Sequence, residues 1–547
     1  MSGFSAHVDR FVFDHLPSRA EWPELRYDLE DLQFDSRLNC ATYLLNAQIE
    51  AGRGLDRCLV TTSGTCSYDE LDVRSNQIAH VLVDDLELRT GNRVMLVGYN
   101  EPMLVACWYA VMKAGAVVVT LPPSLRSGEV VTMARKARIN AVLCNTRAAA
   151  ELDSAVALES VTGRVCWGDD HPDGLEARMA NKPTVFTSVD TAADDPCLIA
   201  FTSGSTGGPK AAVHTHREIA AVSACFRGAA LKPRPHDTFV GSSPMALTYG
   251  LLALACFPLS VGASVVMMPY TSSNQFLEMV EAHRATVCFT VPTVYRTWLN
   301  DVEPAELRTR LASLRVAVSS GEMLPRSVSM AFQAATGLSI VNVLGSTEML
   351  HAFLSTGPYE PRPGSVGRPV RGYKARVLAP DGRDAPVGEV GRLAVVGPTG
   401  CRYLNDSRQS QQVVEGWNLT GDLARMDDDG YFWLEGRVDQ IVVSSGYNIS
   451  LAEVEEVLLG YPGVAECVVV PEPDALRGCT LRAIVVPNSS LCPDADGAAD
   501  LLDYMKREIA GYKCPRSVEF RESLPHTATG KVARAEAGLG SVEERAE

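Results

Sequence analysis

The chain has 547 residues, which is too long for one hydrophobic core, so we expect at least two domains. Its apolar and charged residues, 46% and 21% of the chain, stand in the proportions of a soluble globular protein. The formal net charge of −16 at pH 7 argues against general nucleic-acid binding, because a polyanion would be repelled over most of the surface. Small anions can still bind where N–H donors and lysines gather locally.

Two long apolar stretches, 103–121 and 251–268, raise the question of membrane spans. Lysine and glycine interrupt the first, and proline, serine and glycine interrupt the second, so each is better explained as a buried helix followed by a buried strand. The first ten residues lack the apolar core of a secretory signal, and the 15 cysteines show no metal-ligand spacing. We therefore expect a cytoplasmic protein with reduced, mostly buried thiols, no membrane span and no zinc site.

Helix-like and strand-like patterns alternate through the first two hundred residues. The helical patterns lie at 39–45, 68–83 and 102–113, the strand patterns at 93–98 and 116–121, and a helix followed by a strand at 135–144. Alternation of this kind predicts layered α/β structure with a substantially parallel sheet. The apolar run 197–201 predicts a further buried strand.

A glycine-rich stretch, 202–210, follows this strand. Its first seven residues hold three glycines and four hydroxyl side chains, which makes it too flexible and polar for a core element. The backbone N–H groups of such a loop can turn toward an anion, and Lys210 adds a cationic donor. Pro209 before this lysine and Ala211 after it distinguish the stretch from the Walker phosphate loop. Taken alone, the stretch fits a flexible surface loop equally well.

The α/β pattern continues beyond the loop. After a short strand at 212–214, Thr215 and Glu218 have the spacing of a capping box, which predicts a helix through Phe226. Later patterns predict strands at 263–268, 287–290 and 316–319, and helices at 273–283 and 327–336.

From about residue 364 the character of the chain changes. Glycine and proline punctuate short β-like runs, and Asp429-Gly430 is a hairpin turn signal. Ser450 and Glu453 form a second capping box beyond residue 437. The predicted elements are strands at 375–378, 391–396, 431–434, 465–471 and 481–486, an exposed loop at 488–499, and a helix at 500–510. The fold class is therefore α/β and α+β, with a large N-terminal domain of layered α/β subdomains plus a β-rich subdomain (1–438) and a small α+β C-terminal domain (439–547).

Four further stretches combine small donors with single charges: 342–348, 417–422, 436–439 and 524–534. Together with the loop 202–210, and in this order from about Ser67 to Arg534, they resemble the acyl-adenylate-forming superfamily, which contains acyl- and aryl-CoA synthetases, peptide-synthetase adenylation domains and luciferases. Within it, 345–351 is most similar to the benzoate and 2-aminobenzoate CoA ligases. Leu16-Pro17 and 22–25 are similar to the aminobenzoate members. The resemblance implies a mobile C-terminal domain, and ATP, Mg²⁺ and coenzyme A as cofactors and co-substrates.

The resemblance also implies how charge is handled when a carboxylate attacks the α-phosphorus of ATP. Negative charge then gathers on phosphoryl oxygens, so fixed cations and N–H groups should dominate catalysis. Lys531 matches the lysine that bridges the carboxylate and the phosphate, and Glu348 matches the Mg²⁺ ligand. The residues that match the phosphate-binding loop are Thr202, Ser203, Gly204, Ser205, Thr206, Gly207 and Lys210.

For the nucleoside, Asp422 matches the carboxylate that accepts hydrogen bonds from both ribose hydroxyls, and Arg437 matches a neighbouring nucleotide contact. The other implied nucleotide-binding residues are Gly321, Glu322 and Thr347, with the adenine near Ser320 and Leu344. Many relatives have an aromatic residue at the position of Leu344, so aliphatic packing must replace stacking here. An N-cap, turn-capping or salt-bridge role is the structural alternative for Glu348 and Asp422.

The implied acyl pocket includes the segment 246–250, in which Tyr249 is the candidate wall or gate, and His351, which would meet a ring substituent or carboxylate. The full set is Ala246, Tyr249, Ser320, Gly345 and His351. Amino-acid-activating relatives carry an aspartate in the first segment, whereas 245–249 contains no acid, which disfavours an amino acid as substrate. A core tyrosine and a hydrogen-bonded structural histidine are the alternative.

Thioester formation needs a second arrangement, because in the family the C-terminal domain rotates and withdraws the lysine. The residues implied at the hinge and at the pantetheine tunnel are Asp439, Ser445, Gly446 and Tyr447. The glycine would allow close approach of the slender pantetheine chain. Val442 stands where many relatives have a lysine, and Ala211 stands where glycine is commoner.

We therefore predict an AMP-forming aryl-CoA ligase for a benzoate-like acid, 2-aminobenzoate among them, that releases AMP and pyrophosphate. A stand-alone adenylation enzyme that loads the phosphopantetheine of an acyl-carrier protein is the alternative within enzymes, because both acceptors present the same arm. A nucleotide-binding regulatory protein without catalysis is the alternative from another class. The joint presence of Lys531, Glu348 and Asp422 argues against it.

Overall fold

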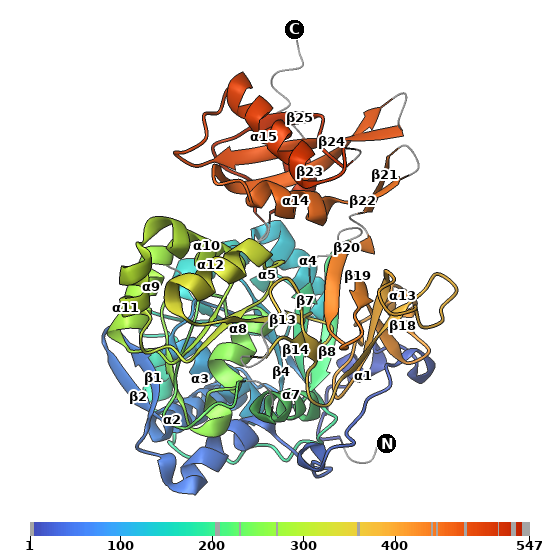
Figure 1. Cartoon of the computed structure of the whole chain (residues 1–547). Coiled ribbons are helices and arrows are strands. Elements are labelled where there is room, and N and C mark those ends of the chain that lie inside the picture. Colours follow the sequence, from blue (N-terminus) through green and yellow to red (C-terminus); the bar gives the residue numbers. More distant parts are fainter. Residues whose placement is uncertain are drawn as a thin grey trace.

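The computed structural model describes residues 5–202, 208–228, 231–269, 272–357, 362–438, 441–444, 447–474, 478–511, 513–526 and 532–538. A large body of mixed helices and strands carries a small C-terminal unit on one side (Figure 1). Helix α14 (Leu451–Leu459) of this unit faces the body, where a carboxylate oxygen of Glu456 accepts a hydrogen bond from the backbone N–H of Arg326 at 3.4 Å. This arrangement agrees with the predicted fold class.

A six-stranded sheet forms the first layer of the body, in the order β6-β5-β3-β4-β7-β8. Its strands are parallel except β8, which runs antiparallel to β7. The strands are β3 (Arg93–Val97), β4 (Val117–Leu121), β5 (Ala141–Asn145), β6 (Gly163–Trp167), β7 (Pro196–Thr202) and β8 (Lys210–Thr215). The accompanying helices are α2 (Tyr68–His80), α3 (Pro102–Lys113), α4 (Ser127–Ala137), α5 (Ala149–Val156) and α6 (Leu175–Ala180). Every residue of β3, β4 and β5 is buried, as expected of parallel strands covered on both faces.

A nine-stranded sheet forms the second layer, in the order β15-β14-β13-β12-β11-β9-β10-β1-β2. Neighbouring strands from β13 to β1 are parallel, and the outer pairs are antiparallel. The strands are β1 (Arg57–Thr61), β2 (Gly64–Ser67), β9 (Thr238–Gly241), β10 (Ser264–Val266), β11 (Val287–Thr290), β12 (Val316–Ser319), β13 (Ile340–Gly345), β14 (Ala352–Ser355) and β15 (Arg368–Pro369). The helices between them are α7 (His216–Gly228), α8 (Thr248–Leu251), α9 (Ser273–Ala282), α10 (Pro292–Asp301), α11 (Pro304–Arg310) and α12 (Arg326–Thr336).

The two apolar stretches fold as predicted. The first forms α3 and β4, and the second forms α8, a π-helical turn at Leu252–Cys256 and β10, all largely buried. Within the described ranges, no helix has both the length and the apolar character needed to cross a membrane. The expected N-terminal helix is also present, after the short α1 (Phe11–Asp14), in the π-helical segments Thr42–Asn46 and Ile49–Arg53.

A smaller antiparallel sheet follows, in the order β16-β17-β19-β18 with β20 beside β19. Its elements are β16 (Lys374–Leu378), β17 (Gly391–Val396), α13 (Gln409–Gln412), β18 (Val413–Val414), β19 (Trp417–Met426) and β20 (Phe432–Arg437). The predicted hairpin turn joins β19 and β20. Gly430 adopts φ +78° there, and its N–H donates to the carbonyl of Asp427 at 2.9 Å.

In its described part, the C-terminal unit packs three helices against a three-stranded sheet, β23-β24-β25, beside the hairpin β21-β22. Its elements are β21 (Ile441–Ser444), β22 (Tyr447–Ser450), α14 (Leu451–Leu459), β23 (Val464–Asp474), β24 (Gly478–Pro487), α15 (Ala495–Glu508), β25 (Ser517–Phe520) and α16 (Arg534–Gly538). The predicted domain boundary at 438/439 falls between β20 and this unit.

Two local predictions in the C-terminal unit are wrong in part. Helix α15 begins at Ala495, inside the predicted loop 488–499, because the Asp494 carboxylate accepts the N–H of Gly497 at 2.9 Å and caps a helix there. The second capping box is half formed, since Ser450 accepts the N–H of Glu453 at 3.3 Å. The Glu453 carboxylate instead accepts hydrogen bonds from Lys513 at 2.6 and 2.8 Å, a partner that the local sequence cannot reveal.

Candidate active site

The glycine-rich loop connects two paired strands, as its flanks predicted. Thr202 at the end of β7 lies opposite Lys210 at the start of β8 in the antiparallel register. The two ends of the loop are therefore fixed next to each other. The predicted phosphate-binding residues Ser203, Gly204, Ser205, Thr206 and Gly207 lie outside the described residues.

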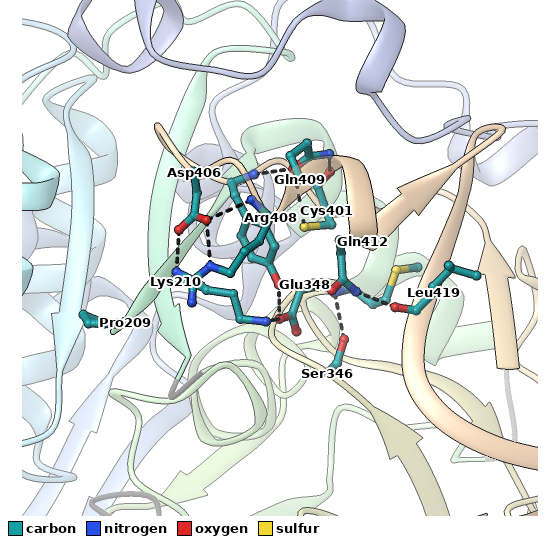
Figure 2. A network of polar contacts seen from close by, with 12 residues as sticks. Pro209, Lys210, Ser346, Glu348, Cys401, Asp406, Arg408, Gln409, Gln412 and Leu419 are labelled. Atoms are coloured by element: carbon teal, nitrogen blue, oxygen red, sulfur yellow. Dashed lines mark hydrogen bonds and ion pairs between the residues drawn. The ribbon is translucent and has the colours of Figure 1, made fainter. Parts of the chain in front are cut away.

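Lys210 points from β8 toward Glu348 (Figure 2). Its Nζ atom lies 3.9 Å from Oε1 of Glu348 and 5.2 Å from the centre of the Tyr403 ring. The hydroxyl of Tyr403 donates a 2.5 Å hydrogen bond to the same carboxylate oxygen. Burial, and then the Glu348 charge, raise the pKa of Tyr403 far above its ordinary value, so the phenol remains a neutral donor. The loop lysine and the predicted metal-binding carboxylate are thus brought together.

A second cationic group holds the end of the loop. Asp406 accepts hydrogen bonds from Lys136 Nζ at 2.6 Å and from two guanidinium nitrogens of Arg408 at 2.7 and 2.6 Å. The same lysine donates to the carbonyl of Pro209 at 3.1 Å, and the same arginine donates to the carbonyl of Gly208 at 3.1 Å. These hydrogen bonds, led by those from Arg408, hold the pKa of Asp406 well below its ordinary range. Three cations therefore surround the loop against two carboxylates.

Glu218 connects the start of α7 to the segment 400–402 that precedes Tyr403. The predicted capping box is present, because its carboxylate accepts the N–H of Thr215 at 2.9 Å. The side chain is fully buried, pairs with Arg402 and accepts the N–H of Gly400 at 3.2 Å. Removing one partner of a buried ion pair costs about 3–5 kcal/mol. The helix cap therefore also fixes the segment that leads into Tyr403.

The turn that carries Glu348 follows β13. The ring Nε2 of His214, on β8, lies 2.8 Å from the carbonyl of Thr347, and Thr399 donates to the carbonyl of Met349 at 2.8 Å. Gly345 is required at the start of this turn, because a Cβ there would lie 2.6 Å from the carbonyl oxygen of His351. Both predicted residues flanking Glu348, Gly345 and Thr347, thus shape its position.

Asp422 and Arg437 face each other across the register of β19 and β20. Nη1 of the arginine donates to Oδ1 of the aspartate at 3.0 Å, and the aspartate is only 8% exposed. Gly421 has φ +81°, and a Cβ at this position would come within 2.8 Å of the guanidinium. A held carboxylate of this kind can accept hydrogen bonds from the hydroxyls of a sugar.

The other predicted nucleotide residues lie at the carboxyl ends of parallel strands, where ligands of open α/β sheets bind. Ser320 and Gly321 follow β12, and Gly321 has φ +88°. Glu322 accepts a hydrogen bond from the Thr293 hydroxyl at 2.9 Å. Leu344 is the residue before the end of β13 and packs partly against the core of the β-rich subdomain, while its packing against adenine stays a prediction.

The acyl-pocket residues Tyr249 and His351 also meet. Their rings stack at 5.5 Å with an interplanar angle of 24°, and the Tyr249 hydroxyl donates to the carbonyl of Thr290 at 3.2 Å. Phe226 and Phe257 pack edge-on against the His351 ring at 4.9 and 4.8 Å. His351 is 3% exposed, and neither ring nitrogen has a hydrogen-bond partner among the described residues. Burial lowers its pKa to about 3, so the imidazole is neutral.

This environment disagrees with the structural alternative for His351, in which the ring would be hydrogen-bonded. A buried polar atom without a partner costs about 1–3 kcal/mol, so it needs an explanation in function or in strain. The neighbouring pocket residue Ala246 is 8% exposed, and its carbonyl accepts the Thr120 hydroxyl at 2.9 Å. Ser320 and Gly345 stand at the strand ends described above.

Several site residues were missed by the sequence analysis. They are Lys136 on α4, Arg402, Tyr403, Asp406 and Arg408. The segment 402–408 has no glycine turn or motif, and Lys136 is an ordinary polar residue of an amphipathic helix. Their role depends on contacts between distant segments, so no local signal marks them.

Some predicted residues cannot be placed. Lys531, Asp439, Ser445 and Gly446 lie outside the described residues. Tyr447 begins β22 and pairs with Ser444 in the hairpin, and Val442 packs partly against the core of the C-terminal unit. Next to Lys531, Val532 bridges His526, and Arg534 is paired with Glu455, with an Nη2–Oε2 distance of 3.0 Å. His526 and Val532 are thus paired with each other, and Arg534 is paired with α14.

Comparison with known proteins agrees with this geometry. Residues 48–402 match the family described as AMP-binding enzyme, and residues 453–531 match the AMP-binding enzyme C-terminal domain. The chain belongs to the AMP-binding enzyme family. Among curated relatives, it is 30% identical to benzoate–CoA ligase of Thauera aromatica over 92% of this chain and 96% of that one. It is 32% identical to feruloyl-CoA synthase of an Amycolatopsis species over 86% and 93% of the two chains.

Solved structures of the family confirm the fold. The anthranilate CoA ligase AuaEII, in complex with anthranoyl-AMP, superposes with a TM-score of 0.87 at 27% identity, covering 93% of this chain and 98% of that one. A benzoate CoA ligase from Burkholderia xenovorans LB400 has a TM-score of 0.83 at 28% identity, covering 91% and 99%. Membership of the AMP-binding family makes the chain a ligase of the acyl- or aryl-CoA synthetase class, and the use of ATP and CoA follows.

Proposed function

We propose that the chain activates a benzoate-like aromatic acid, 2-aminobenzoate among the candidates, as an acyl-adenylate and then transfers the acyl group to CoA. The observation that carries the proposal is the aromatic surroundings of His351. Its ring packs against Tyr249, Phe226 and Phe257, and none of these three side chains is charged. An aromatic ring packs favourably against such side chains, and the unpartnered imidazole nitrogens would meet a polar ring substituent.

The first half-reaction needs an electrophile, because a carboxylate resists direct attack. One carboxylate oxygen bonds to the α-phosphorus of ATP, the bond to the bridging oxygen breaks, and pyrophosphate leaves. Lys210 would stabilise the charge on the leaving phosphates, together with the loop that Lys136 and Arg408 hold in place. We assign Asp422 to the ribose hydroxyls, and Lys531 to the bridge between the carboxylate and the α-phosphate.

Mg²⁺ fits the donor set at Glu348. Its carboxylate oxygens are hard donors, and their nearest described donor is the neutral phenol of Tyr403 at 2.5 Å, with Lys210 farther away at 3.9 Å. Lys210 is therefore an ion-pair partner at the outer limit of contact, and the carboxylate keeps lone pairs that a metal ion could bind. When bound, Mg²⁺ would neutralise charge on the phosphates, with Glu348 as its protein ligand.

The second half-reaction uses the thiol of CoA. The thiol sulfur bonds to the acyl carbon, AMP leaves, and the thiol proton is released. We propose that the C-terminal unit rotates about Asp439 between the two steps, so that Tyr447, Ser445 and Gly446 border the pantetheine chain. The range 439–547 then acts as a mobile domain on the body 1–438.

A panel of acids in a pyrophosphate-release assay tests the proposal. We expect release with benzoate, aminobenzoates or hydroxybenzoates, little release with acetate or with amino acids, and aryl-CoA when CoA is added. Replacing CoA by a phosphopantetheinylated carrier protein, and weighing the product, distinguishes the two acceptors. ATP binding without pyrophosphate release across the whole panel would contradict the proposal.

A further inference from the structure

Two cysteines face each other on neighbouring strands of the six-stranded sheet. Cys144 on β5 and Cys166 on β6 are directly opposite in the parallel register, and their Sγ atoms lie 3.4 Å apart. Parallel strands stand about 4.7–4.9 Å apart, within the Cα separation of about 4.4–6.8 Å that disulfides accept. The two thiols are therefore already placed for a covalent bond between the strands.

The two thiols differ in access and in acidity. Cys144 is buried, whereas Cys166 is partly exposed on β6, the edge strand of the six-stranded sheet. Arg164 lies two residues before Cys166 and so on the same face of the strand. The hydrogen bond from the Cys144 thiol, and then the Arg164 charge, lower the pKa of Cys166 to about 7, and the same contact raises the pKa of Cys144. The exposed member is therefore the nucleophile.

A second cysteine pair, Cys40 and Cys197, shows why solvent access matters as well as proximity. Cys40 and Cys197 lie beside His216, and the two Sγ atoms and one ring nitrogen of the histidine are all within 4.8 Å of one another. All three side chains are fully buried, so a solvent-borne reagent reaches none of them directly. The two sulfur atoms are close together in both pairs, but of these two pairs only Cys144 and Cys166 include a thiol that solvent can reach.

The strand ends beyond the two cysteines converge on one carboxylate. Asn145 and Trp167, which follow Cys144 and Cys166, both donate to Oε1 of Glu101, at 2.8 and 2.6 Å. The residue before this carboxylate, Asn100, accepts the N–H of Met245 at 2.8 Å and donates to the carbonyl of Ser243 at 3.0 Å. These two sets of hydrogen bonds meet at the peptide bond between Asn100 and Glu101, and so connect the cysteine strands to Ser243 and Met245, just before the proposed acyl-pocket segment.

We propose that Cys144 and Cys166 are a hydroperoxide-sensitive pair whose reversible disulfide acts on the acyl-pocket segment through Glu101 and Asn100. The Cys166 thiolate attacks hydrogen peroxide, an S–O bond forms, the O–O bond breaks and hydroxide leaves. The Cys144 sulfur then attacks Cys166, the S–S bond forms and the S–O bond breaks. The hydroxide of the first step takes up the proton that Cys166 released on ionising, and the hydroxide of the second step takes the thiol proton of Cys144, so each leaves as water. Two thiols are oxidised, and one peroxide is reduced to two waters.

Formation of the bond brings the two sulfur atoms from 3.4 Å to about 2.05 Å and fixes the side-chain torsions of both cysteines, and we expect the strand ends beside them to adjust. Asn145 and Trp167 are the next residues along the two strands, so their shared contact with Glu101 shifts with them. The acyl-pocket segment is held at Met245 by the neighbouring asparagine. Its position therefore depends on the redox state of the pair. This consequence rests on the proposed function, whereas the disulfide itself does not.

Mass spectrometry of the full chain tests the disulfide directly. The reduced protein is titrated with hydrogen peroxide, free thiols are alkylated, and the protein is digested with trypsin. Residues 139–147 and 165–178 form two tryptic peptides with one cysteine each, so the disulfide appears as one cross-linked species. We expect it at lower peroxide than any Cys40–Cys197 cross-link, and we expect dithiothreitol to remove it.

Three variants control this measurement. Cys166→Ser should abolish the cross-link, and Cys144→Ser should leave a sulfenic acid at Cys166 that dimedone traps. Cys492→Ser removes an exposed cysteine of the C-terminal unit and should leave the cross-link unchanged. A dimedone adduct at Cys166 of the unmutated chain without a cross-link, or prior oxidation of the buried pair, would overturn the assignment.

Kinetics of the oxidised enzyme test the link to the acyl pocket. With the cross-link complete, we expect the KM for the acid to rise about fivefold, at the low end of couplings between distant sites, and to return with dithiothreitol. The Cys166→Ser variant should show no such change under the same peroxide. A complete cross-link with an unchanged KM would refute the link while leaving the disulfide and the proposed ligase activity intact.

Discussion

The phosphate side and the acyl side of the candidate site are built in opposite ways. On the phosphate side, Lys210, Lys136 and Arg408 each have a carboxylate partner in the protein. On the acyl side, His351 is buried among aromatic rings without a hydrogen-bond partner among the described residues. On the phosphate side, the protein itself pairs the charged groups that would hold the nucleotide, which is the same in every reaction. On the acyl side, it leaves the ring nitrogens of His351 without a partner in the described part of the chain, so that they can distinguish one acid from another.

The charged side should show the largest functional loss. Lys210→Ala removes the cation at the end of the loop, and we expect the rate of pyrophosphate release to fall about 100-fold or more, as when a group that stabilises transition-state charge is lost. Lys374→Ala, at an exposed lysine of β16, is the matched control and should have no effect. A loss below about threefold in the assay would mean that the loop lysine does not contact the reacting phosphates.

The acyl side should contribute to the pH dependence of stability through His351. The pKa of His351 is lowered to about 3, below its ordinary value of 6.5, so between these pH values the unfolded chain binds the additional proton. The stability gained from a neutral imidazole is thus complete above about pH 6.5 and declines as the pH falls toward 3. Between about pH 7 and pH 5, the free energy of unfolding should fall by about 2 kcal/mol more in the wild type than in His351→Phe.

Urea denaturation at both pH values measures this difference. His236→Gln, at an exposed histidine, serves as the control and should lose stability in parallel with the wild type. Parallel loss in His351→Phe as well would show that the ring is not held neutral in the folded state.

The loop anchor should have a moderate effect. Asp406→Asn removes the charge that holds Lys136 and Arg408 against the loop carbonyls, and misplacement of the loop should lower kcat/KM for ATP about tenfold. The effect should fall mainly on KM for ATP, with KM for the acid unchanged. Equal rises in both KM values would indicate a distortion of the whole site rather than a displaced loop.

The smallest expected effect concerns the choice of acid. His351→Phe keeps the ring but removes both nitrogens, so the KM of a ring-substituted benzoate should rise about fivefold relative to that of benzoate, the equivalent of one hydrogen bond. Steady-state kinetics with the two acids on one enzyme preparation gives this ratio. A rise that is equal for both acids would assign the histidine to shape alone.

The sequence revealed much of the fold because its signals were local. The strands around the loop, the Thr215–Glu218 capping box and the Asp429-Gly430 turn all depend on neighbouring residues. The two errors arose where a side chain bonded to a distant residue, or where a short polar segment formed a helix cap instead of a loop. Glu453 prefers Lys513 to its own helix end, and Asp494 caps a helix where an exposed loop was expected.

The residues of the candidate site also fall into those that a local motif reveals and those that only contacts between distant segments reveal. Motif residues such as Lys210, Glu348 and Asp422 could be identified because their spacing matches a family, and the structure brings the first two together. Tyr403, Asp406 and Lys136 could not, since they contact the loop only after folding. The unsatisfied state of His351 is likewise a property of packing, because it requires knowing what fails to reach the ring.

The central claim, that one chain adenylates an aromatic acid and then forms its thioester in a different arrangement, is tested most directly with Lys531→Ala. Single-turnover reactions are followed by mass, first from ATP, acid and CoA, and then from supplied acyl-adenylate and CoA. We expect the first reaction to be nearly abolished in the variant and the second to match the wild type. Intact adenylation, or equal loss of both reactions, would contradict the account.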